Sequence, residues 1–352
     1  MNKENMAMSN RAIPWDMVRC PTCLGHVEHQ DNIIVCSNLV CHKTYPVVEG
    51  IPILINEESS VFSFDDFAEN KTTFFQKRGR FAEWINQHAP SISHNLAAKQ
   101  NYKKLSELAL KDKPLARILV IGGSIAGQGF EILSENSALE LMETDVSFGP
   151  RVTMICDGHD LPFADGSFDV VIAQAVLEHV VDPFRCVSQF YRVLRDDGLI
   201  YAETPFMQQV HGGKYDFMRF TYRGHRRLFR NFEEIHAGII GGPGMALAWS
   251  WQYFLRNFAR SRSAQMFLAM LGRLTAFYLK YFDYLFKSSQ AAYDASSGFY
   301  FMGRKSKNTL SDKDLVRLIF LVSGSTVLIV TCKLRILHRF GRSSAPKKYI
   351  VG

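Results

Sequence analysis

The sequence predicts an α/β fold, a doubly wound and mostly parallel sheet that is preceded by a small cysteine-rich module. Two observations predict the sheet. Short apolar runs alternate with segments of helical spacing, and the first run, ARILVI, leads into a glycine-rich turn. A third observation predicts the module, because four of the seven cysteines lie between Cys20 and Cys41. The 352 residues, 47% of them hydrophobic, suffice for two domains with a sizeable core.

The net charge bears on possible partners, and the N-terminal residues bear on the cellular compartment. The formal net charge is +7, which points only weakly to acidic partners. The opening MNKENMAMSNRAIPWDMV lacks the apolar core of a secretory signal, so we expect the reducing cytoplasm. Clustered cysteines in that compartment hold metals more often than they form disulfides.

The cysteine spacing predicts a structural zinc site. A C-x2-C pair is followed by a C-x4-C pair, and the short run between them contains NIIV. Two such knuckles joined by a hairpin bring four thiolates to one tetrahedral site, made by Cys20, Cys23, Cys36 and Cys41. Four protein ligands leave no open position, and the metal would supply folding energy that so short a segment lacks. Two disulfides, four unligated thiols, or His42 in place of Cys41 are the alternatives.

The end of this module carries a recognisable pattern. The run CHKTYPVVEGIPILINEES resembles the zinc-ribbon family typified by the tRNA-methyltransferase activator subunit. The matching residues are Tyr45, Pro46, Gly50, Ile51, Pro52 and Leu54. The resemblance covers about residues 18–58 and implies a zinc-ribbon domain there. Members of that family accompany a methyltransferase, as a partner or as a fused domain.

The next stretch, residues 59–113, is expected to be a helical linker. Helical spacing appears in FFQKRGRFAEWINQ and again in LAAKQNYKKLSELAL. Their basic residues are interpreted as a solvated face, not as a binding patch.

A nucleotide-binding pattern begins after Pro114. A strand over about 117–121 leads into a turn in which three glycines let the backbone bend and approach a ligand: Gly122, Gly123 and Gly127. A helix is expected to begin near Gly129, with its N-terminal amides facing the same place. The second strand ends at Asp145, which can accept both hydroxyls of a ribose. NAD, FAD, S-adenosylmethionine (SAM), or no ligand at all would fit this pattern.

Two further strands narrow this choice. A third strand ends at Cys156, so Asp157 and Gly158 would meet the adenine of a nucleoside. The fourth, over about 168–174, is a nearly continuous apolar run typical of a buried parallel strand. It ends at Gln174, at the carboxyl edge where open α/β sheets bind their ligands.

This block closely resembles the class I SAM-dependent methyltransferases of the type 11 subgroup, over about residues 115–206. The residues that match the family pattern are Asp157, Leu161, Pro162, Phe163, Asp165, Phe168, Asp169, Val171, Leu177, Glu178 and His179. The resemblance implies a seven-stranded Rossmann-like domain over 114–306 that binds SAM. One departure is Val120, which stands where the family has an acid that holds the donor's amino group. Another group would have to contact that amine.

The acceptor side is expected to follow the fourth and fifth strands. The sulfonium is already activated, so the protein mainly aligns the acceptor behind the methyl group. Where a hydroxyl or amine must lose a proton, His179 and His211 are the candidate bases, although His179 could instead bond the backbone. The substrate-binding candidates are His211, Asp216 and Arg219, while Arg226, Arg227 and Arg230 read as a helix surface.

Two C-terminal segments raise the question of a membrane. Residues 244–290 are expected to be inserted helices whose aromatic and arginine side chains hold an amphipathic substrate, touch a membrane, fill a core or pair two copies. In the basic tail, 307–352, the fifteen uncharged residues Leu318–Cys332 fall short of a span of about twenty. A buried terminal element, a membrane anchor and a disordered tail remain open.

The sequence therefore predicts a SAM-dependent methyltransferase whose acceptor is unidentified, with a small molecule, lipid or saccharide favoured. The alternatives are a catalytically weak binding module that acts with a partner, and an RNA or protein methyltransferase. Nucleic acid is not an expected partner, because no aromatic-basic RNA module is evident. A homodimer and membrane association through the C-terminal region stay open.

Overall fold

The computed structural model describes residues 13–68, 89–318, 320–323 and 326–329. It confirms the predicted fold class, with a seven-stranded sheet ordered β7-β6-β5-β8-β9-β11-β10. Strand β11 pairs antiparallel with both β9 and β10, and the other neighbouring strands of these seven pair parallel. The sequence analysis missed β10. The strands are β5 (Ala116–Ile121), β6 (Leu139–Asp145), β7 (Met154–Cys156), β8 (Phe168–Gln174), β9 (Leu194–Pro205), β10 (Phe232–Gly241) and β11 (Gly298–Lys305).

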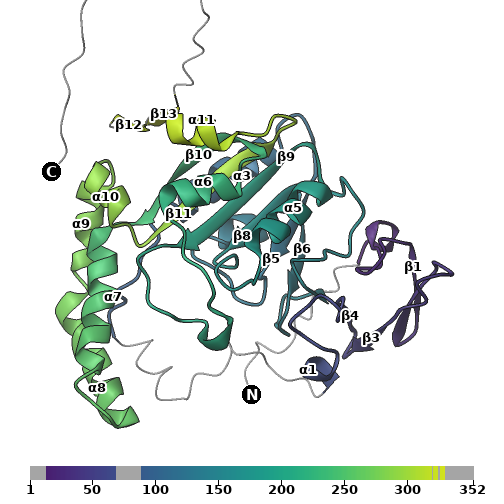
Figure 1. Cartoon of the computed structure of the whole chain (residues 1–352), viewed down its shortest axis with the longest axis horizontal. Coiled ribbons are helices and arrows are strands. Elements are labelled where there is room, and N and C mark those ends of the chain that lie inside the picture. The colour runs from purple at the N-terminus through teal and green to yellow at the C-terminus, as the bar shows by residue number, and fades with distance from the viewer. Residues whose placement is uncertain (1–12, 69–88, 319, 324–325, 330–352) are drawn as a thin grey trace, which may run out of the picture.

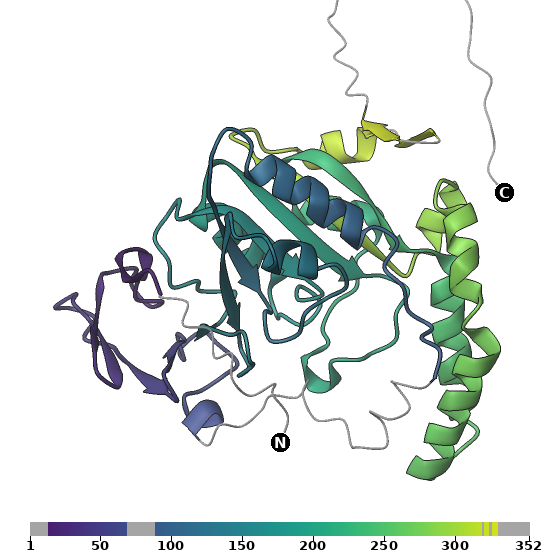
Figure 2. The same ribbon diagram turned by 180° about the vertical axis from the view of Figure 1, so that it is seen from behind.

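Helices cover both faces of this sheet. On one face lie α3 (Ala98–Ala109) and α4 (Glu131–Ser134), and on the other lie α5 (Pro183–Val193) and α6 (Tyr222–Leu228) (Figures 1 and 2). Successive residues of β8 alternate between the two cores: Val170 and Ile172 pack with α3, and Val171 and Ala173 with α5. Burial on both faces explains the continuous apolar run of this strand.

The N-terminal module is joined to the sheet edge (Figure 1). Its strands β1 (Val27–Gln30), β2 (Ile33–Cys36), β3 (Thr44–Val48) and β4 (Ile51–Leu54) pair antiparallel in chain order. Strand β4 then pairs parallel with β7, with Ile53 opposite Ile155, so that one sheet of eleven strands results. A bridge between Val18 and Phe163 adds a second junction. The module therefore shares its hydrophobic core with the methyltransferase-like domain.

Four helices separate β10 from β11: α7 (Pro243–Arg256), α8 (Arg262–Ala276), α9 (Leu279–Phe286) and α10 (Gln290–Asp294). They stand as a column beside the sheet (Figure 1). The buried Asp283 of α9 accepts hydrogen bonds from the amides of Gly242, Gly244 and Met245, so it caps the start of α7. Large apolar side chains remain exposed, with Leu285 at 76% and Phe258 at 71%.

Three helical expectations meet different outcomes. The expected helix over 96–110 is α3, while the one over 74–87 lies outside the described residues, and α1 (Asp65–Ala68) precedes that gap. The helix expected near Gly129 begins at Glu131 and has four residues, because Gly129 has a left-handed φ of +85°. So short a helix offers no N-terminal site for a ligand, although its N-terminal amides were expected to face the glycine turn.

The C-terminal segment was expected to be a tail. It contains α11 (Asp312–Arg317), β12 (Phe320–Ser323) and β13 (Thr326–Ile329), and the two strands form an antiparallel hairpin. The rest of the apolar run, including 330–332, lies outside the described residues. Within the described parts of the chain, no helix has both the length and the apolar character to cross a bilayer.

Candidate active site

A cavity of about 590 Å³ opens at the carboxyl edge of the parallel strands, as the topology predicts. All seven residues that the sequence analysis assigned to the cofactor line it: Gly122, Gly123, Gly127, Asp145, Asp157, Gly158 and Gln174. His179 and His211 line it as well, whereas Asp216 and Arg219 do not. The residues expected to bind the methyl donor and both candidate bases therefore line the same cavity.

The glycine turn is hydrogen-bonded to the end of β6. Gly122 has a left-handed φ of +79°, and a Cβ there would lie 2.5 Å from Val176. The amide of Ser124 donates to the Asp145 carboxylate at 2.9 Å. Burial raises the pKa of Asp145. The turn and the acid at the tip of β6 thus form one rigid wall of the cavity.

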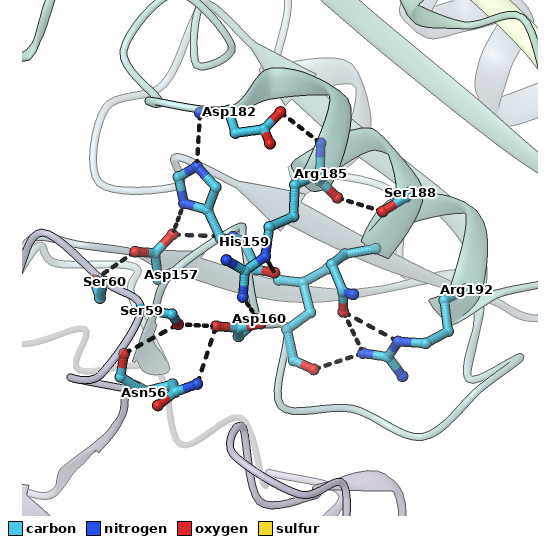
Figure 3. A network of polar contacts seen from close by, with 12 residues as sticks. Asn56, Ser59, Ser60, Asp157, His159, Asp160, Asp182, Arg185, Ser188 and Arg192 are labelled. Carbon is cyan, nitrogen blue, oxygen red and sulfur yellow. Dashed lines mark hydrogen bonds and ion pairs between the residues drawn. The ribbon is translucent and has the colours of Figure 1, made fainter.

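A polar network connects the other end of the cavity to the ribbon (Figure 3). The Asp157 carboxylate accepts hydrogen bonds from the His159 ring at 2.5 Å and from the Ser60 hydroxyl at 2.5 Å. Burial opposes ionisation of Asp157, but these donors outweigh it and lower its pKa. Next to it, Asp160 accepts from Asn56 at 3.3 Å. The sequence does not predict these contacts, because Ser60 and Asp157 are 97 residues apart in the chain.

A second missed group is Glu203 at the end of β9. It is fully buried, lines the cavity, and accepts hydrogen bonds from Gln174 at 2.9 Å and from Asn95 at 2.9 Å. Tyr102 of α3 donates to Gln174 at 2.8 Å. Burial raises the pKa of Glu203. Its position opposite Gln174 in the register of β8 and β9 is the signal that could have identified it.

The two candidate bases lie face to edge, with ring centroids 4.8 Å apart. His179 bonds the carbonyl of Tyr215 through Nδ1 at 3.0 Å, the backbone contact considered as an alternative. His211 has Nδ1 at 3.3 Å from the carbonyl of Gln209. Burial lowers the pKa of both rings. Beside them, burial raises the pKa of the fully buried Glu178 to about 8.

Asp216 and Arg219 hold the loop that carries His211. The carboxylate of Asp216 accepts from the amide of His211 at 2.7 Å and pairs with the Arg219 guanidinium. Arg219 also donates to the Gln208 carbonyl at 3.1 Å, and its charge helps to hold the pKa of Asp216 well below the usual range. Their expected contact with substrate stays a prediction, and their observed contacts are within the loop.

The other arginines of this region face the protein. Arg226 is buried and pairs with Glu234 at 3.0 Å. Arg227 and Arg230 both pair with Asp312 in α11. All three arginines contact the protein itself, as the structural interpretation expected, but Arg226 is buried and does not lie on a helix surface.

The four cysteines of the ribbon converge. The Sγ atoms of Cys20, Cys23, Cys36 and Cys41 lie within 4.8 Å of one another. The Cys20–Cys41 and Cys23–Cys36 separations are 3.7 and 3.5 Å, close to the roughly 3.8 Å expected for thiolates bound tetrahedrally at about 2.3 Å from zinc. His42 does not belong to this group of described residues. The donor set fits a closed tetrahedral zinc site.

Comparison with known proteins agrees with this architecture. Residues 123–202 match the family model described as a methyltransferase domain, type 11. An uncharacterised methyltransferase from Mycobacterium sp. (strain KMS) is 52% identical over 42 residues, which cover 12% of this chain and 17% of that relative. The match thus spans about a sixth of the relative's length.

The other similarities concern the ribbon and the fold. A UPF0434 protein from Psychromonas ingrahamii is 33% identical over 54 residues, which cover 14% of this chain and 86% of that protein. The structure of Haemonchus contortus phosphoethanolamine N-methyltransferase 2 with SAM has a TM-score of 0.44 and 18% identity, covering 70% of this chain and 61% of that one. The family assignment rests on the family-model match, the sheet order, the four-cysteine cluster and the UPF0434 relative. The chain belongs to the class I SAM-dependent methyltransferases of the type 11 subgroup, with an N-terminal zinc-ribbon domain.

Proposed function

We propose that this protein transfers a methyl group from SAM to a small molecule, lipid or saccharide. The observation that carries the proposal is the single cavity lined by all seven expected donor residues and by two histidines. SAM supplies an activated methyl group, so the acceptor atom displaces the sulfur in line and the acceptor loses a proton. The chain needs only to hold the two molecules aligned and to exclude water.

Each end of the donor has a group in the cavity that suits it. Asp145 would accept from the ribose hydroxyls, and Asp157 with Gly158 would contact the adenine. At the methionine end Val120 offers no charge. Glu203 supplies the missing carboxylate, because it lies in the cavity wall and is held by Gln174 beside the glycine turn. A buried carboxylate of this kind suits a donor ammonium.

The acceptor would approach His179 and His211, which are within reach to take its proton where it carries one. The exposed aromatic side chains of α7, α8 and α9, with Arg256 and Arg273, offer a surface for an amphipathic acceptor, a membrane or a second copy. In the ribbon, Zn²⁺ bound by the four thiolates would be structural, since no ligand position stays open.

Calorimetry with SAM tests the donor site. We expect wild-type protein to bind SAM, and Asp145→Ala to weaken binding about 10- to 100-fold, since hydrogen bonds to a charged group contribute roughly 1.5–3 kcal/mol. Asp165→Ala is the control, because that side chain is 78% exposed and does not line the cavity. Radiolabelled SAM with lysate fractions sorted into lipid, glycan, protein and RNA would then identify the acceptor class.

The second candidate function is a binding module that keeps the fold without turnover. Two observations favour it: Val120 replaces the family acid, and Gln174 Oε1 stands 1.8 Å from where a Cβ on Gly127 would lie. The side chain of Gln174 thus occupies space beside the glycine turn. Absence of SAM binding by wild-type protein would select this function over methyl transfer.

A further inference from the structure

Glu178 lies just after β8. Its side chain has no solvent exposure, and neither carboxyl oxygen has a hydrogen-bond partner among the described residues. A buried polar group without a partner costs roughly 1–3 kcal/mol. Other buried acids of this domain, Glu203 and Asp157 among them, have several donors each. Glu178 therefore needs an explanation that packing alone does not give.

Two imidazoles are aimed at this carboxyl group. Oε1 of Glu178 lies 3.8 Å from Nε2 of His179 and 3.8 Å from Nε2 of His211. Each ring has its other nitrogen, Nδ1, at a backbone carbonyl, that of Tyr215 or that of Gln209. A neutral ring that donates through Nδ1 presents the lone pair of Nε2. This arrangement, with the second nitrogen held by a carbonyl, is typical of histidines that bind metals.

Nδ1 of His211 lies near both hydrogen-bond acceptors and a hydrogen-bond donor. Besides the Gln209 carbonyl, the Asp216 carboxylate lies at 3.4 Å and a nitrogen of Arg219 at 3.4 Å. Two acceptors against one donor favour a proton on Nδ1, so the lone pair of Nε2 faces the side of Glu178, where an ion could bind it together with a carboxylate oxygen.

The loop that brings His211 to this place is built to fit. Gly212 packs so closely on His179 that a Cβ would lie 2.4 Å from its Nδ1. The Asp216–Arg219 pair fixes the same loop through the amides of His211 and Gly212. The ligand atoms of Glu178, His179 and His211 lie within 4.8 Å of one another without any rearrangement. The cluster is thus already assembled.

We propose that Glu178, His179 and His211 bind a divalent first-row transition-metal ion in the wall of the cavity. Two imidazoles and one carboxylate are a common ligand set for such ions, and three protein ligands leave coordination positions open. Because His179 and His211 line the cavity, those positions would face an acceptor that offers oxygen atoms, such as adjacent hydroxyls. With Nε2 of each ring bound to the ion, the histidines would hold the metal and would not take the acceptor's proton, and the ion would instead favour the deprotonated form of a bound hydroxyl. Only this last step rests on the proposed methyl transfer, since metal binding itself does not depend on it.

Cobalt binding to the full-length, zinc-loaded protein tests the proposal. With the thiolate site filled by zinc, we expect one additional Co²⁺ per chain whose visible spectrum lacks thiolate charge-transfer bands. Glu178→Gln, nearly isosteric, and His211→Ala, on a loop, should each weaken Co²⁺ binding at least 10-fold. His225→Leu removes a buried imidazole elsewhere and should leave Co²⁺ binding unchanged.

The outcomes separate cleanly. No cobalt beyond the thiolate site, or equal Co²⁺ affinity in wild type and both ligand variants, would overturn the proposal. Thermal unfolding of each variant shows whether it is folded. SAM calorimetry on Glu178→Gln distinguishes the two hypotheses, because loss of Co²⁺ binding with retained SAM binding affects the metal site alone.

Discussion

Among the residues that the structure describes, two clusters of potential metal ligands differ in their number of ligands and in their place in the fold. In the ribbon, four thiolates from two hairpin knuckles surround one point and leave no position open. At the cavity, Glu178 follows β8 while His211 comes from the loop after β9, and only three ligands meet. The comparison teaches that ligand number and location separate a site that stabilises a fold from one that can meet a substrate.

The largest expected effect comes from opening the closed cluster. Cys36→Ser should release zinc and cost more than about 5 kcal/mol of ribbon stability, since structural zinc contributes roughly 10–16 kcal/mol in small peptides. Zinc content per chain and denaturant unfolding would measure this. Cys186→Ser, at another buried cysteine outside the cluster, should keep its zinc. Equal zinc content in wild type and Cys36→Ser would refute the structural site.

At the cluster of Glu178, His179 and His211, a substitution is expected to raise stability instead of lowering it. Glu178→Met should raise the free energy of unfolding of the cobalt-free protein by about 1–3 kcal/mol, because it removes a buried carboxyl group that lacks partners. Glu203→Met is the matched control and should destabilise, since it strands the donors on Gln174 and Asn95. Urea unfolding would measure the free energy of unfolding of both variants and of the wild type. Destabilisation of both alike would show that Glu178 is structural.

A third prediction concerns His225, a buried histidine that belongs to neither cluster. Burial lowers the pKa of His225 to about 3, from 6.5 for an ordinary histidine. Its neutral form is thus favoured in the folded state, so stability is lost as the pH falls below 6.5. The loss reaches about 2 kcal/mol at pH 5. His225→Leu should remove that part of the pH dependence in urea unfolding, whereas His26→Leu, at an exposed site, should not. An unchanged profile in His225→Leu would contradict the assignment.

The smallest effect concerns the bridge between the two regions. Ser60→Ala removes a hydrogen bond to Asp157 and should weaken SAM binding by up to about 1 kcal/mol, roughly 5-fold. Ser59→Ala breaks the neighbouring bond to Asp160, which does not line the cavity, and should leave SAM affinity unchanged. Calorimetry on both variants compares them, and an equal loss in both would mean that the linker acts through folding alone.

The sequence predicted the elements whose signals are local. The apolar run of β8, the glycine turn and the cysteine spacing each identify a structure within a few residues. It missed β10, because Glu233, Glu234 and His236 interrupt the apolar pattern of that strand. It also did not identify Glu203 as a member of the site, since the role of a buried acid depends on its partners, here Gln174 of β8 and Asn95 before α3.

Asp216 and Arg219 show the same limit from the other side. Their charges were expected to meet a substrate, yet they bind each other and the backbone of the loop. Residue type predicts which contacts a side chain can make. The three-dimensional structure shows the partners these side chains have without a ligand, an ion pair between residues three positions apart on one loop, while their contact with a substrate stays a prediction.

The parallel pairing of β4 with β7 also bears on how the protein can be divided. A shortened chain starting after the ribbon would leave the backbone amides and carbonyls along β7 bare. Bare strand edges recruit other strands, so such a fragment would tend to self-associate. Strand β4 therefore protects the edge of the methyltransferase sheet as well as completing the ribbon.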